Sequence, residues 1–333
     1  MQNQNTREVS HRSVLKDEVS ELLEKERYAP LNIQARLIDA TVGLGGHAEE
    51  FVKSGWQVLG IDVDKEAIEV AEEVLKQARL RQVADATKLK RRSDYGGQAC
   101  PTRLSRKTGP FKLIQDSFKD IKKIAQEHGF NKVEAILFDL GVSVPQLTSK
   151  TRGFSFQSVD AALDMRLGKT TQNVSAADLL NALSEKQLIK LFGVVMPLNI
   201  SRRIANRVVD RRKIEKFRKV GDFVDVIEND GYGRSKLNPA TLPFMALRIA
   251  VNSELDILQM ALPDAFSLLA VGGRLAVISF HSGEDKIVKH IFKSLEGRSK
   301  GIIITKKPIT PTRREVILNP RARSAKLRVI RKI

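Results

Sequence analysis

Cysteine is almost absent from this sequence of 333 residues, in which Cys100 is the only one. A single cysteine cannot form an internal disulfide, so disulfide-stapled folds are excluded. No Cys/His cluster has the ligand spacing of a zinc site, and we expect no bound metal. This cysteine usage fits a reducing compartment, and we therefore expect a cytoplasmic protein.

Long apolar runs are also missing. The amino terminus is polar, and no run approaches the roughly 20 residues needed to cross a bilayer, so neither a signal peptide nor a membrane span is expected. Aromatic residues make up only 5% of the chain, which argues against binding nucleic acid mainly by base stacking. Hydrophobic residues at 42% are enough for a buried core, and the length fits two compact units.

Negative charge is scarce relative to positive charge. Lys and Arg number 57 against 39 Asp and Glu, which leaves a formal net charge of +18. Such a balance suits a polyanionic partner, either nucleic acid or an anionic membrane surface, although a merely solubilising surface is an alternative. The positive charge is concentrated in residues 88–107, 202–219 and 313–332. The first of these segments has the composition of a loop.

The hydrophobic pattern of the two ends of the chain is typical of an α/β fold. Residues 37–40 form a strand-like run that meets a glycine-rich turn and a helix, and residues 58–62 form a second strand that ends on a carboxylate. This order is the opening of a doubly wound, Rossmann-like parallel sheet. The remaining elements expected for this part are a helix from 65 to about 80, a helix over 121–128, a strand over 133–139, a helix over 243–269, a strand over 274–280 and an edge strand over 325–330.

The middle of the chain carries a different pattern. From residue 148 to residue 236 strand signals vanish and helical periodicity dominates. We expect helices over 176–180, 185–192, 200–213 and 220–227. The sequence therefore predicts a sheet domain formed by residues 1–147 and 237–333, with an all-helical domain, 148–236, inserted into it.

The glycine loop after the first strand indicates a nucleotide-like ligand. Gly43, Gly45 and Ala48 satisfy the dinucleotide fingerprint, and Asp62 lies at the right distance to hold a ribose. Asp39 would repel a pyrophosphate but could accept hydrogen bonds from the ammonium group of S-adenosyl-L-methionine. The residues favour this methyl donor over a nicotinamide cofactor, and a tight turn without a ligand is the remaining alternative.

Several segments together resemble the RsmH (MraW) family of bacterial methyltransferases, which make N4-methylcytidine in small-subunit ribosomal RNA. The segments that carry the resemblance are His11-Arg12-Ser13-Val14-Leu15, Asp39-Ala40-Thr41-Val42-Gly43-Leu44-Gly45-Gly46-His47, Asp139-Leu140-Gly141-Val142-Ser143, Arg152-Gly153-Phe154-Ser155-Phe156, Leu163-Asp164-Met165-Arg166, Asn238-Pro239-Ala240-Thr241, Ala246-Leu247-Arg248-Ile249, Val251-Asn252-Ser253-Glu254-Leu255, Ser279-Phe280-His281-Ser282 and Asn319-Pro320-Arg321-Ala322-Arg323-Ser324-Ala325. Their order and spacing agree over most of residues 10–330.

The resemblance implies a class I methyltransferase with S-adenosyl-L-methionine as cofactor and a cytidine of 16S ribosomal RNA as substrate. The residues that it assigns to the donor are Gly45, Gly46, His47, Asp62, Phe118, Asp139 and Gln146. Phe118 offers an apolar face for the adenine, and Gln146 can both donate and accept hydrogen bonds. The chain departs from the family pattern at Val144, Val194, Val195 and Gly283, and in the long basic segment 88–107.

Methyl transfer to an exocyclic amine requires alignment of two reactants and an acceptor for the amine protons. Asp139 is the first candidate for this acceptor, and binding of the donor alone is its alternative role. The Asn/Asp-Pro-Pro-aromatic motif of many amino methyltransferases is absent from this strand end, so the usual acceptor geometry cannot be transferred.

Candidate residues for RNA contact lie outside the donor loop. Asp164 and Arg166 could orient the target base or its phosphate, and a structural ion pair is the alternative. Arg203 and Arg207 recur at helical spacing with Arg211, while Ile200, Ile204 and Val208 can pack inward. His281 could contact RNA, or it could simply begin a helix that Ser282 and Asp285 cap.

The expected partner is small-subunit ribosomal RNA, within the small subunit or its precursor, and no membrane. The sequence leaves open whether the chain acts as a monomer or a homodimer. Two other classes of function are compatible with the residues alone. One is a nicotinamide-dependent oxidoreductase, and the other is a non-catalytic RNA-binding assembly factor.

Overall fold

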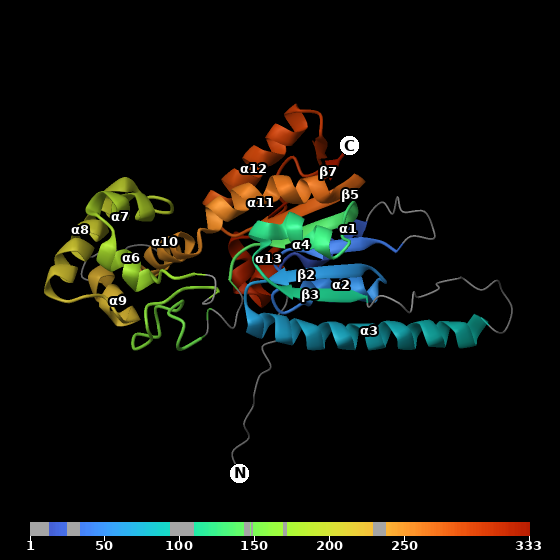
Figure 1. Ribbon diagram of the computed structural model, residues 1–333, viewed down its shortest axis with the longest axis horizontal. Helices are drawn as coiled ribbons and strands as arrows, with labels where there is room; N and C mark the ends of the chain where they lie inside the picture. The colour runs from blue at the N-terminus through green and yellow to red at the C-terminus, as the bar shows by residue number, and fades with distance from the viewer. Residues whose placement is uncertain are drawn as a thin grey trace, which may run out of the picture. The chain divides into compact units, whose positions relative to one another are not determined.

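The structure is a computed structural model that describes residues 13–24, 34–93, 110–142, 147, 149–168, 172–228 and 238–333. The chain folds into two compact units (Figure 1). The first comprises residues 1–141, 261–281 and 288–333, and the second comprises residues 142–260 and 282–287. The segment predicted as a helical insertion lies within the second unit, which also includes residues 237–260.

The first unit is built on a sheet whose described strands follow the order β3-β2-β1-β4-β5-β7-β6. The strands are β1 (Arg36–Asp39), β2 (Gln57–Asp62), β3 (Phe111–Gln115), β4 (Val133–Asp139), β5 (Leu269–Ser279), β6 (Gly301–Ile303) and β7 (Lys326–Lys332). The strands from β3 to β5 are parallel, whereas β7 pairs antiparallel with both β5 and β6. The predicted Rossmann-like α/β class is therefore confirmed.

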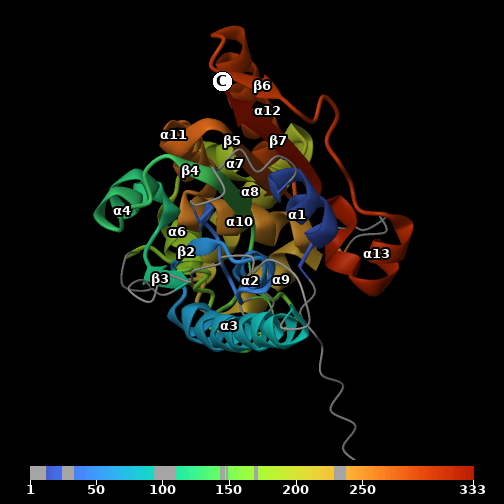
Figure 2. The ribbon, with the colours of Figure 1, turned by 90° about the vertical axis from the view of Figure 1, so that its right-hand side faces the viewer.

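Helices cover both faces of this sheet. They are α1 (Lys16–Glu24), α2 (Gly46–Lys53), α3 (Lys65–Ser93), α4 (Ile121–Glu127), α11 (Glu254–Leu268), α12 (Ser282–Gly297) and α13 (Arg313–Leu318), with the short 3-10 helices η1 (Phe118–Asp120) and η2 (Pro320–Ser324). One buried cluster joins α1, α2 and α3 to one face, with Phe51 and Leu75 packed against Leu37 and Leu137. Figure 2 shows α4 and α11 on the opposite face.

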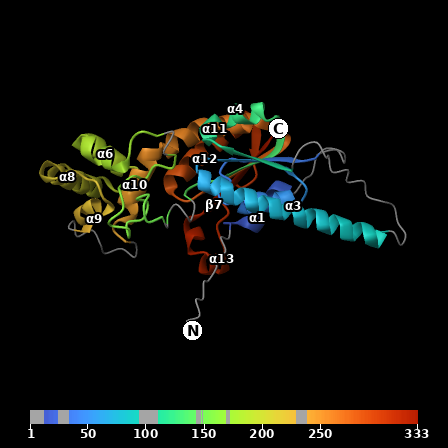
Figure 3. The same cartoon turned by 60° about the horizontal axis from the view of Figure 1, so that its bottom comes forward.

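Two elements of the first unit differ from the sequence prediction because their sequences lack an apolar period. Helix α3 was expected to end near residue 80, but it continues to Ser93, so residues 88–93 are helical rather than part of a loop. Figures 1 and 3 show α3 running past the end of the sheet. Strand β3 was not predicted, since its residues are partly or fully exposed and form no apolar run.

Two further boundaries were wrong. The helix predicted over 243–269 is two helices, α10 (Thr241–Asn252) and α11, separated by Ser253 in the left-handed region at φ 49°. Strand β7 was expected at the sheet edge, but β6 pairs with its outer side and occupies the edge instead. Residues 301–303 are too few to carry a strand period that could have been recognised.

The second unit is helical in its described residues. Besides α10 it contains α6 (Ala176–Ala182), α7 (Glu185–Phe192), α8 (Leu198–Ile214) and α9 (Val220–Glu228). Helices α6 and α7 each begin with a complete capping box, at Ser175 and Ser184. The predicted inward residues Ile200, Ile204 and Val208 are buried.

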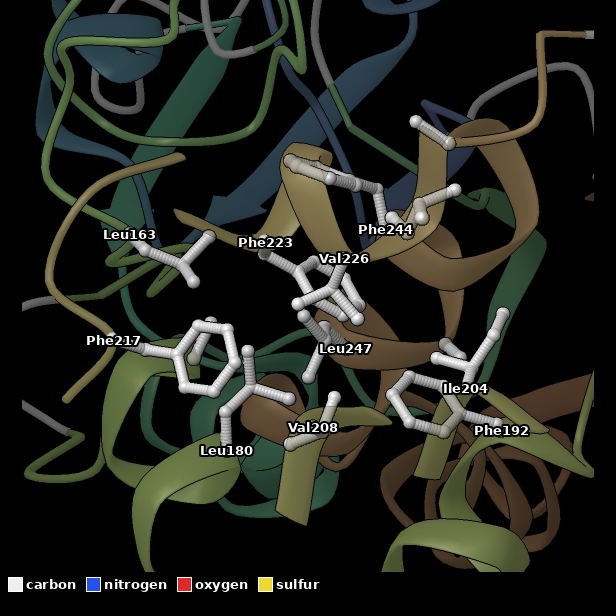
Figure 4. Packing of buried hydrophobic residues seen from close by; sticks show 14 of the residues in the cluster. Leu163, Leu180, Phe192, Ile204, Val208, Phe217, Phe223, Val226, Phe244 and Leu247 are labelled. Carbon is white, nitrogen blue, oxygen red and sulfur yellow. The ribbon is translucent and has the colours of Figure 1, made fainter. Parts of the chain in front are cut away.

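The core of the second unit explains why residues 237–260 belong to it. Phe244 and Leu247 of α10 pack among Phe192, Phe223 and Val208 (Figure 4). The ring centroids of Phe223 and Phe244 are 5.5 Å apart. Helix α10 therefore buries its apolar face in the helical core. Within the described residues, no helix has both the length and the apolar character needed to span a membrane.

Candidate functional site

Three carboxylates lie at the carboxyl ends of neighbouring strands. Asp39 ends β1, Asp62 ends β2 and Asp139 ends β4, and β1 lies between β2 and β4. From β1 the chain proceeds to β2 and β3 on one side, and then returns to β4 and β5 on the other. Ligands of open α/β sheets bind outside the carboxyl ends of the strands at such a reversal. The fold therefore brings these three predicted residues to one candidate site.

The glycine loop that follows β1 has the backbone conformation that only glycine adopts readily. Gly43 and Gly45 have φ angles of +50° and +84°. A Cβ atom at Gly45 would lie 3.3 Å from Ala71, and one at Gly46 would collide with the Ser13 hydroxyl, so protein atoms already fill both spaces. A Cβ atom at Gly43 would meet only the Thr41 carbonyl, at 3.8 Å. Gly43 is thus the loop position that leaves most room for a ligand.

Asp62 fixes the shape of this loop. One carboxylate oxygen accepts a hydrogen bond from the Gly43 amide at 2.9 Å, and the other accepts one from the Asp64 amide at 2.9 Å. Burial raises the pKa of Asp62 to about 6, against the effect of these backbone donors. Each oxygen retains a lone pair, so the carboxylate can still accept from ligand hydroxyl groups.

Asp39 is almost completely buried, with 1% of its surface exposed. Its Oδ1 accepts a hydrogen bond from the Thr41 amide at 3.3 Å. Burial raises the pKa of Asp39 to about 7, the nearby His47 opposes this increase, and Asp139 and Asp62 add to it. An uncompensated carboxylate in this position is therefore poised to gain a cationic partner.

His47 and Asp139 face each other across the site. Nε2 of His47 lies 3.5 Å from Oδ2 of Asp139, and the Asp139 amide donates to the Thr41 hydroxyl at 2.6 Å. His47 is 6% exposed. Among the described residues, His47 Nε2 and Asp139 Oδ1 are buried without a hydrogen-bond partner. Because an unsatisfied buried polar atom costs about 1–3 kcal/mol, these two atoms mark a place that suits a polar ligand.

Further residues singled out in the sequence are the donor residues Phe118 and Gln146, the departure at Val144 and the RNA candidate His281. Phe118 begins η1, just after β3, and its ring packs edge-on against the buried Phe138 at a centroid distance of 5.4 Å. Gln146 and Val144 lie outside the described residues. His281 follows β5 in the first unit and is partly buried.

The predicted pair of Asp164 and Arg166 forms within the second unit. Nε of Arg166 donates to Oδ1 of Asp164 at 2.7 Å, and Nη2 donates to Oδ2 at 3.0 Å. Arg166 also donates to the carbonyl of Gln172 at 3.0 Å. This two-point geometry holds both side chains in fixed orientations.

Sequence reasoning missed the residue that supports this pair. Asn252 is 3% exposed, and its amide oxygen accepts from the Leu167 amide at 2.9 Å while its nitrogen donates to the Met165 carbonyl at 2.9 Å. Met165 itself has a φ of 61°. Asn252 thus clamps the strained backbone on both sides of Arg166. Its position in the resembling segment 251–255 was the only signal for this role.

The arginines predicted on α8 divide into two groups. Arg203 is exposed and Arg207 is partly buried. Arg211 donates to the Glu215 carbonyl at 2.8 Å and lies over the Phe217 ring. Arg211 is therefore engaged in contacts within the helical unit, and the cationic face of α8 stays a prediction.

Comparison with known proteins identifies the chain. The model of the MraW methylase family matches residues 8–93 and 91–333. Ribosomal RNA small subunit methyltransferase H of Methylacidiphilum infernorum is 38% identical over 308 residues, covering 89% of this chain and 88% of that protein. The protein of the same name from Dictyoglomus thermophilum is 39% identical over 311 residues, covering 92% and 94%. The chain belongs to the MraW methylase family, as its motifs predicted, and S-adenosyl-L-methionine is its cofactor.

Proposed function

We propose that this methylase transfers a methyl group from S-adenosyl-L-methionine to the N4 amine of a cytidine in 16S ribosomal RNA. The cluster of Asp39, Asp62 and Asp139 around the glycine loop, with two buried polar atoms left unsatisfied, is the observation that carries the proposal. The names of the relatives support small-subunit ribosomal RNA as the substrate.

The residues of this cluster suit the parts of the donor. The Asp62 carboxylate accepts hydrogen bonds from the ribose hydroxyls, and Asp39 accepts from the ammonium group of the methionine part. Gly45 and Gly46 shape the loop, and His47 Nε2 bonds a polar group of the donor. Phe118 lies against the adenine, with Gln146 at a polar edge of the donor.

The chemistry at the target requires a proton acceptor. When bound, S-adenosyl-L-methionine would supply an electrophilic sulfonium methyl group, whose bond to sulfur breaks as the amine attacks, with S-adenosylhomocysteine as the leaving group. The lone pair of the cytosine amine is delocalised into the ring, and an acceptor at the amine hydrogens localises it on nitrogen as the new N–C bond forms. Oδ1 of Asp139 is a buried acceptor without a hydrogen-bond partner in the described residues, and it takes the proton that the amine releases. Exclusion of water from this site by the bound reactants strengthens the hydrogen bond.

The RNA lies against basic side chains of both units. In the second unit Arg203 and Arg207 of α8 bind phosphates, and Asp164 and Arg166 orient the target nucleotide. In the first unit His281 contacts the RNA. The target base leaves its stack to reach the donor, which costs a few kcal/mol and favours an exposed site in the small subunit or its precursor. The protein acts in the cytoplasm, as a monomer or a homodimer.

A labelling experiment tests the proposal. Unmodified small subunits and free 16S RNA are incubated with the protein and isotopically labelled donor, and modified nucleosides are mapped by mass spectrometry. N4-methylcytidine at one position is expected. Label on another base or atom contradicts the proposed specificity. RNA binding with no label transferred favours an assembly factor, and a melting temperature raised by NAD but not by S-adenosylhomocysteine favours an oxidoreductase.

A further inference from the structure

The carboxyl-terminal segment of the first unit carries exposed positive charge that the described structure does not neutralise. Arg313 and Arg314 of α13 and Arg321 and Arg323 of η2 are all exposed. Within the described residues, no acidic side chain pairs with any of these four. By contrast, α8 uses Arg211 and Arg212 for contacts inside its own unit. The α13–η2 surface, defined by these four arginines, is thus available to an external polyanion.

The same surface presents apolar side chains. Ile317 and Leu318 of α13 are 71% and 58% exposed. Figure 2 shows α13 at one side of the sheet, on the same side as α1. Single-stranded RNA offers phosphates for the arginines together with riboses and unstacked bases for apolar side chains. A mixed basic and apolar surface fits this ligand better than it fits a purely solubilising role.

The only acidic residue after Glu296 in the sequence is Glu315, and it is engaged elsewhere. Its Oε1 accepts a hydrogen bond from the Leu15 amide at 2.8 Å, although the two residues are 300 positions apart in the chain. Leu15 is fully buried and has a φ of 52°. The carboxylate therefore fixes a strained, buried turn near the amino terminus, and no ion pair joins it to the four arginines within the described residues.

This turn lies against the donor loop. Ser13 occupies the space that a side chain on Gly46 would need. A continuous set of contacts thus runs from α13 through Glu315 and residues 13–15 to Gly46. The hydrogen bond at Leu15 and the approach of Ser13 to Gly46 are the contacts that connect α13 with the backbone of the loop.

We propose that the α13–η2 surface binds the backbone of the RNA substrate, and that Glu315 is a positioning residue that connects this surface to the donor loop. This inference rests on the proposed function, since it takes RNA as the substrate. It adds a docking site in the sheet unit to the one proposed on α8.

Charge-matched variants test the docking site. One variant replaces the four arginines by glutamine: Arg313→Gln, Arg314→Gln, Arg321→Gln and Arg323→Gln. The control removes four exposed lysines from α4 and α12: Lys122→Gln, Lys123→Gln, Lys289→Gln and Lys293→Gln. Binding of 16S RNA transcribed in vitro is measured by fluorescence anisotropy at several salt concentrations, and folding of both variants is checked by thermal denaturation.

The arginine variant is expected to bind this RNA at least tenfold more weakly than the lysine control, with a salt slope smaller by about 2 to 3. Equal affinity of the two variants overturns the docking site. If the arginine variant loses binding to intact small subunits but keeps its affinity for the transcript, the docking site is also overturned. The α13–η2 surface then binds a ribosomal protein. Absence of binding by the unaltered protein to both the transcript and intact small subunits contradicts the proposed function itself.

Glu315 is tested with two variants, of which one keeps a hydrogen-bond acceptor and the other removes it. Glu315→Gln keeps a carbonyl oxygen for the Leu15 amide, whereas Glu315→Ala removes it. Calorimetry with S-adenosylhomocysteine is expected to show about tenfold weaker binding for the alanine variant and near-normal binding for the glutamine variant. Unchanged binding in the alanine variant, or equal losses in both, overturns the positioning role.

Discussion

Nε2 of His47 lies 3.5 Å from Oδ2 of Asp139, while the other oxygen of Asp139 is buried without a hydrogen-bond partner in the described structure. The two oxygens of one carboxylate therefore have different surroundings. Oδ2 lies near the imidazole, and Oδ1 remains as an acceptor. A carboxylate held in this way combines binding and proton acceptance in one side chain, and this combination distinguishes Asp139 from Asp62, whose two oxygens both accept backbone hydrogen bonds.

Asp139→Asn tests the acceptor role. The amide keeps the shape of the side chain but cannot accept a proton, so methyl transfer is expected to fall about 10²- to 10⁴-fold. Binding of S-adenosylhomocysteine should weaken much less. Single-turnover kinetics and calorimetry provide the two measurements. If transfer and binding both stay near those of the unaltered protein, Asp139 has neither role.

Asp62→Ala tests how the donor loop is held. The substitution leaves the Gly43 and Asp64 amides without their acceptor and removes the proposed ribose ligand. Calorimetry should show S-adenosylhomocysteine bound roughly 100-fold more weakly. Asp62→Asn is the matched control, since one oxygen remains and the loss should be smaller. Equal affinities for all three proteins would contradict the assignment.

The raised pKa of Asp39 predicts how the free energy of unfolding changes with pH, in the direction opposite to that of an ordinary ion-paired carboxylate. Its pKa is raised from 3.8 to about 7, so between these values the native state binds a proton that the unfolded chain has lost. The contribution of this group to the free energy of unfolding therefore decreases as the pH rises through that window. Asp39→Asn removes the decrease and should stabilise the protein at pH 8 by on the order of 2–4 kcal/mol.

Urea denaturation of the unaltered protein and of Asp39→Asn at pH 5 and pH 8 measures this effect on stability. Asp39→Asn should also bind the donor more weakly, because it removes the carboxylate proposed to accept from the ammonium group. Equal stabilities at pH 8 would show that Asp39 ionises without penalty. For the unaltered protein, donor binding should strengthen as the pH rises towards 8, since the ionised form of Asp39 is the one that attracts a cation.

Salt should weaken the binding of RNA far more than the binding of the methyl donor. The net charge of +18 and the exposed arginines imply that RNA is held largely through phosphates. Methylation at subsaturating RNA should fall steeply between about 50 and 200 mM salt, whereas affinity for S-adenosylhomocysteine should change little. In the same buffers, filter binding measures the affinity for RNA and calorimetry measures the affinity for S-adenosylhomocysteine. A similar insensitivity of both affinities to salt would refute electrostatic docking.

The donor loop and its carboxylates could be predicted from the sequence because they depend on local signals. Asp39, Asp62 and Asp139 each end a short apolar strand, and parallel strands in this order place their ends together. The reasons for the glycines could not be predicted. Gly45 is needed against Ala71 and Gly46 against Ser13, and both contacts form only in the folded chain.

Elements without a local signal were missed or misplaced. Strand β3 has no apolar alternation, and its position follows from pairing with β2. The sequence placed the end of the helical insertion at residue 236, and the apolar period of α10 does not say which core will bury that helix. The break at Ser253 depends on a left-handed residue between two helical patterns, and serine gives no warning of it.

Asn252 yields the last prediction, which concerns the second unit. Asn252→Ala leaves the Leu167 amide and the Met165 carbonyl without their partner, and it should destabilise the protein by about 2–4 kcal/mol. It should also free the backbone around Arg166, so methylation of RNA should fall more than the loss of folded protein explains.

Asn181→Ala is the matched control, because Asn181 makes the same pair of backbone hydrogen bonds to Phe217, away from Arg166. Both variants should lose stability in thermal denaturation. At a temperature where both are folded, only Asn252→Ala should lose methylation with unchanged binding of S-adenosylhomocysteine, because that substitution alone releases the backbone that orients the Asp164–Arg166 pair. Equal activity of the two folded variants would mean that Asn252 contributes stability alone and that the orientation of Arg166 is not needed for turnover.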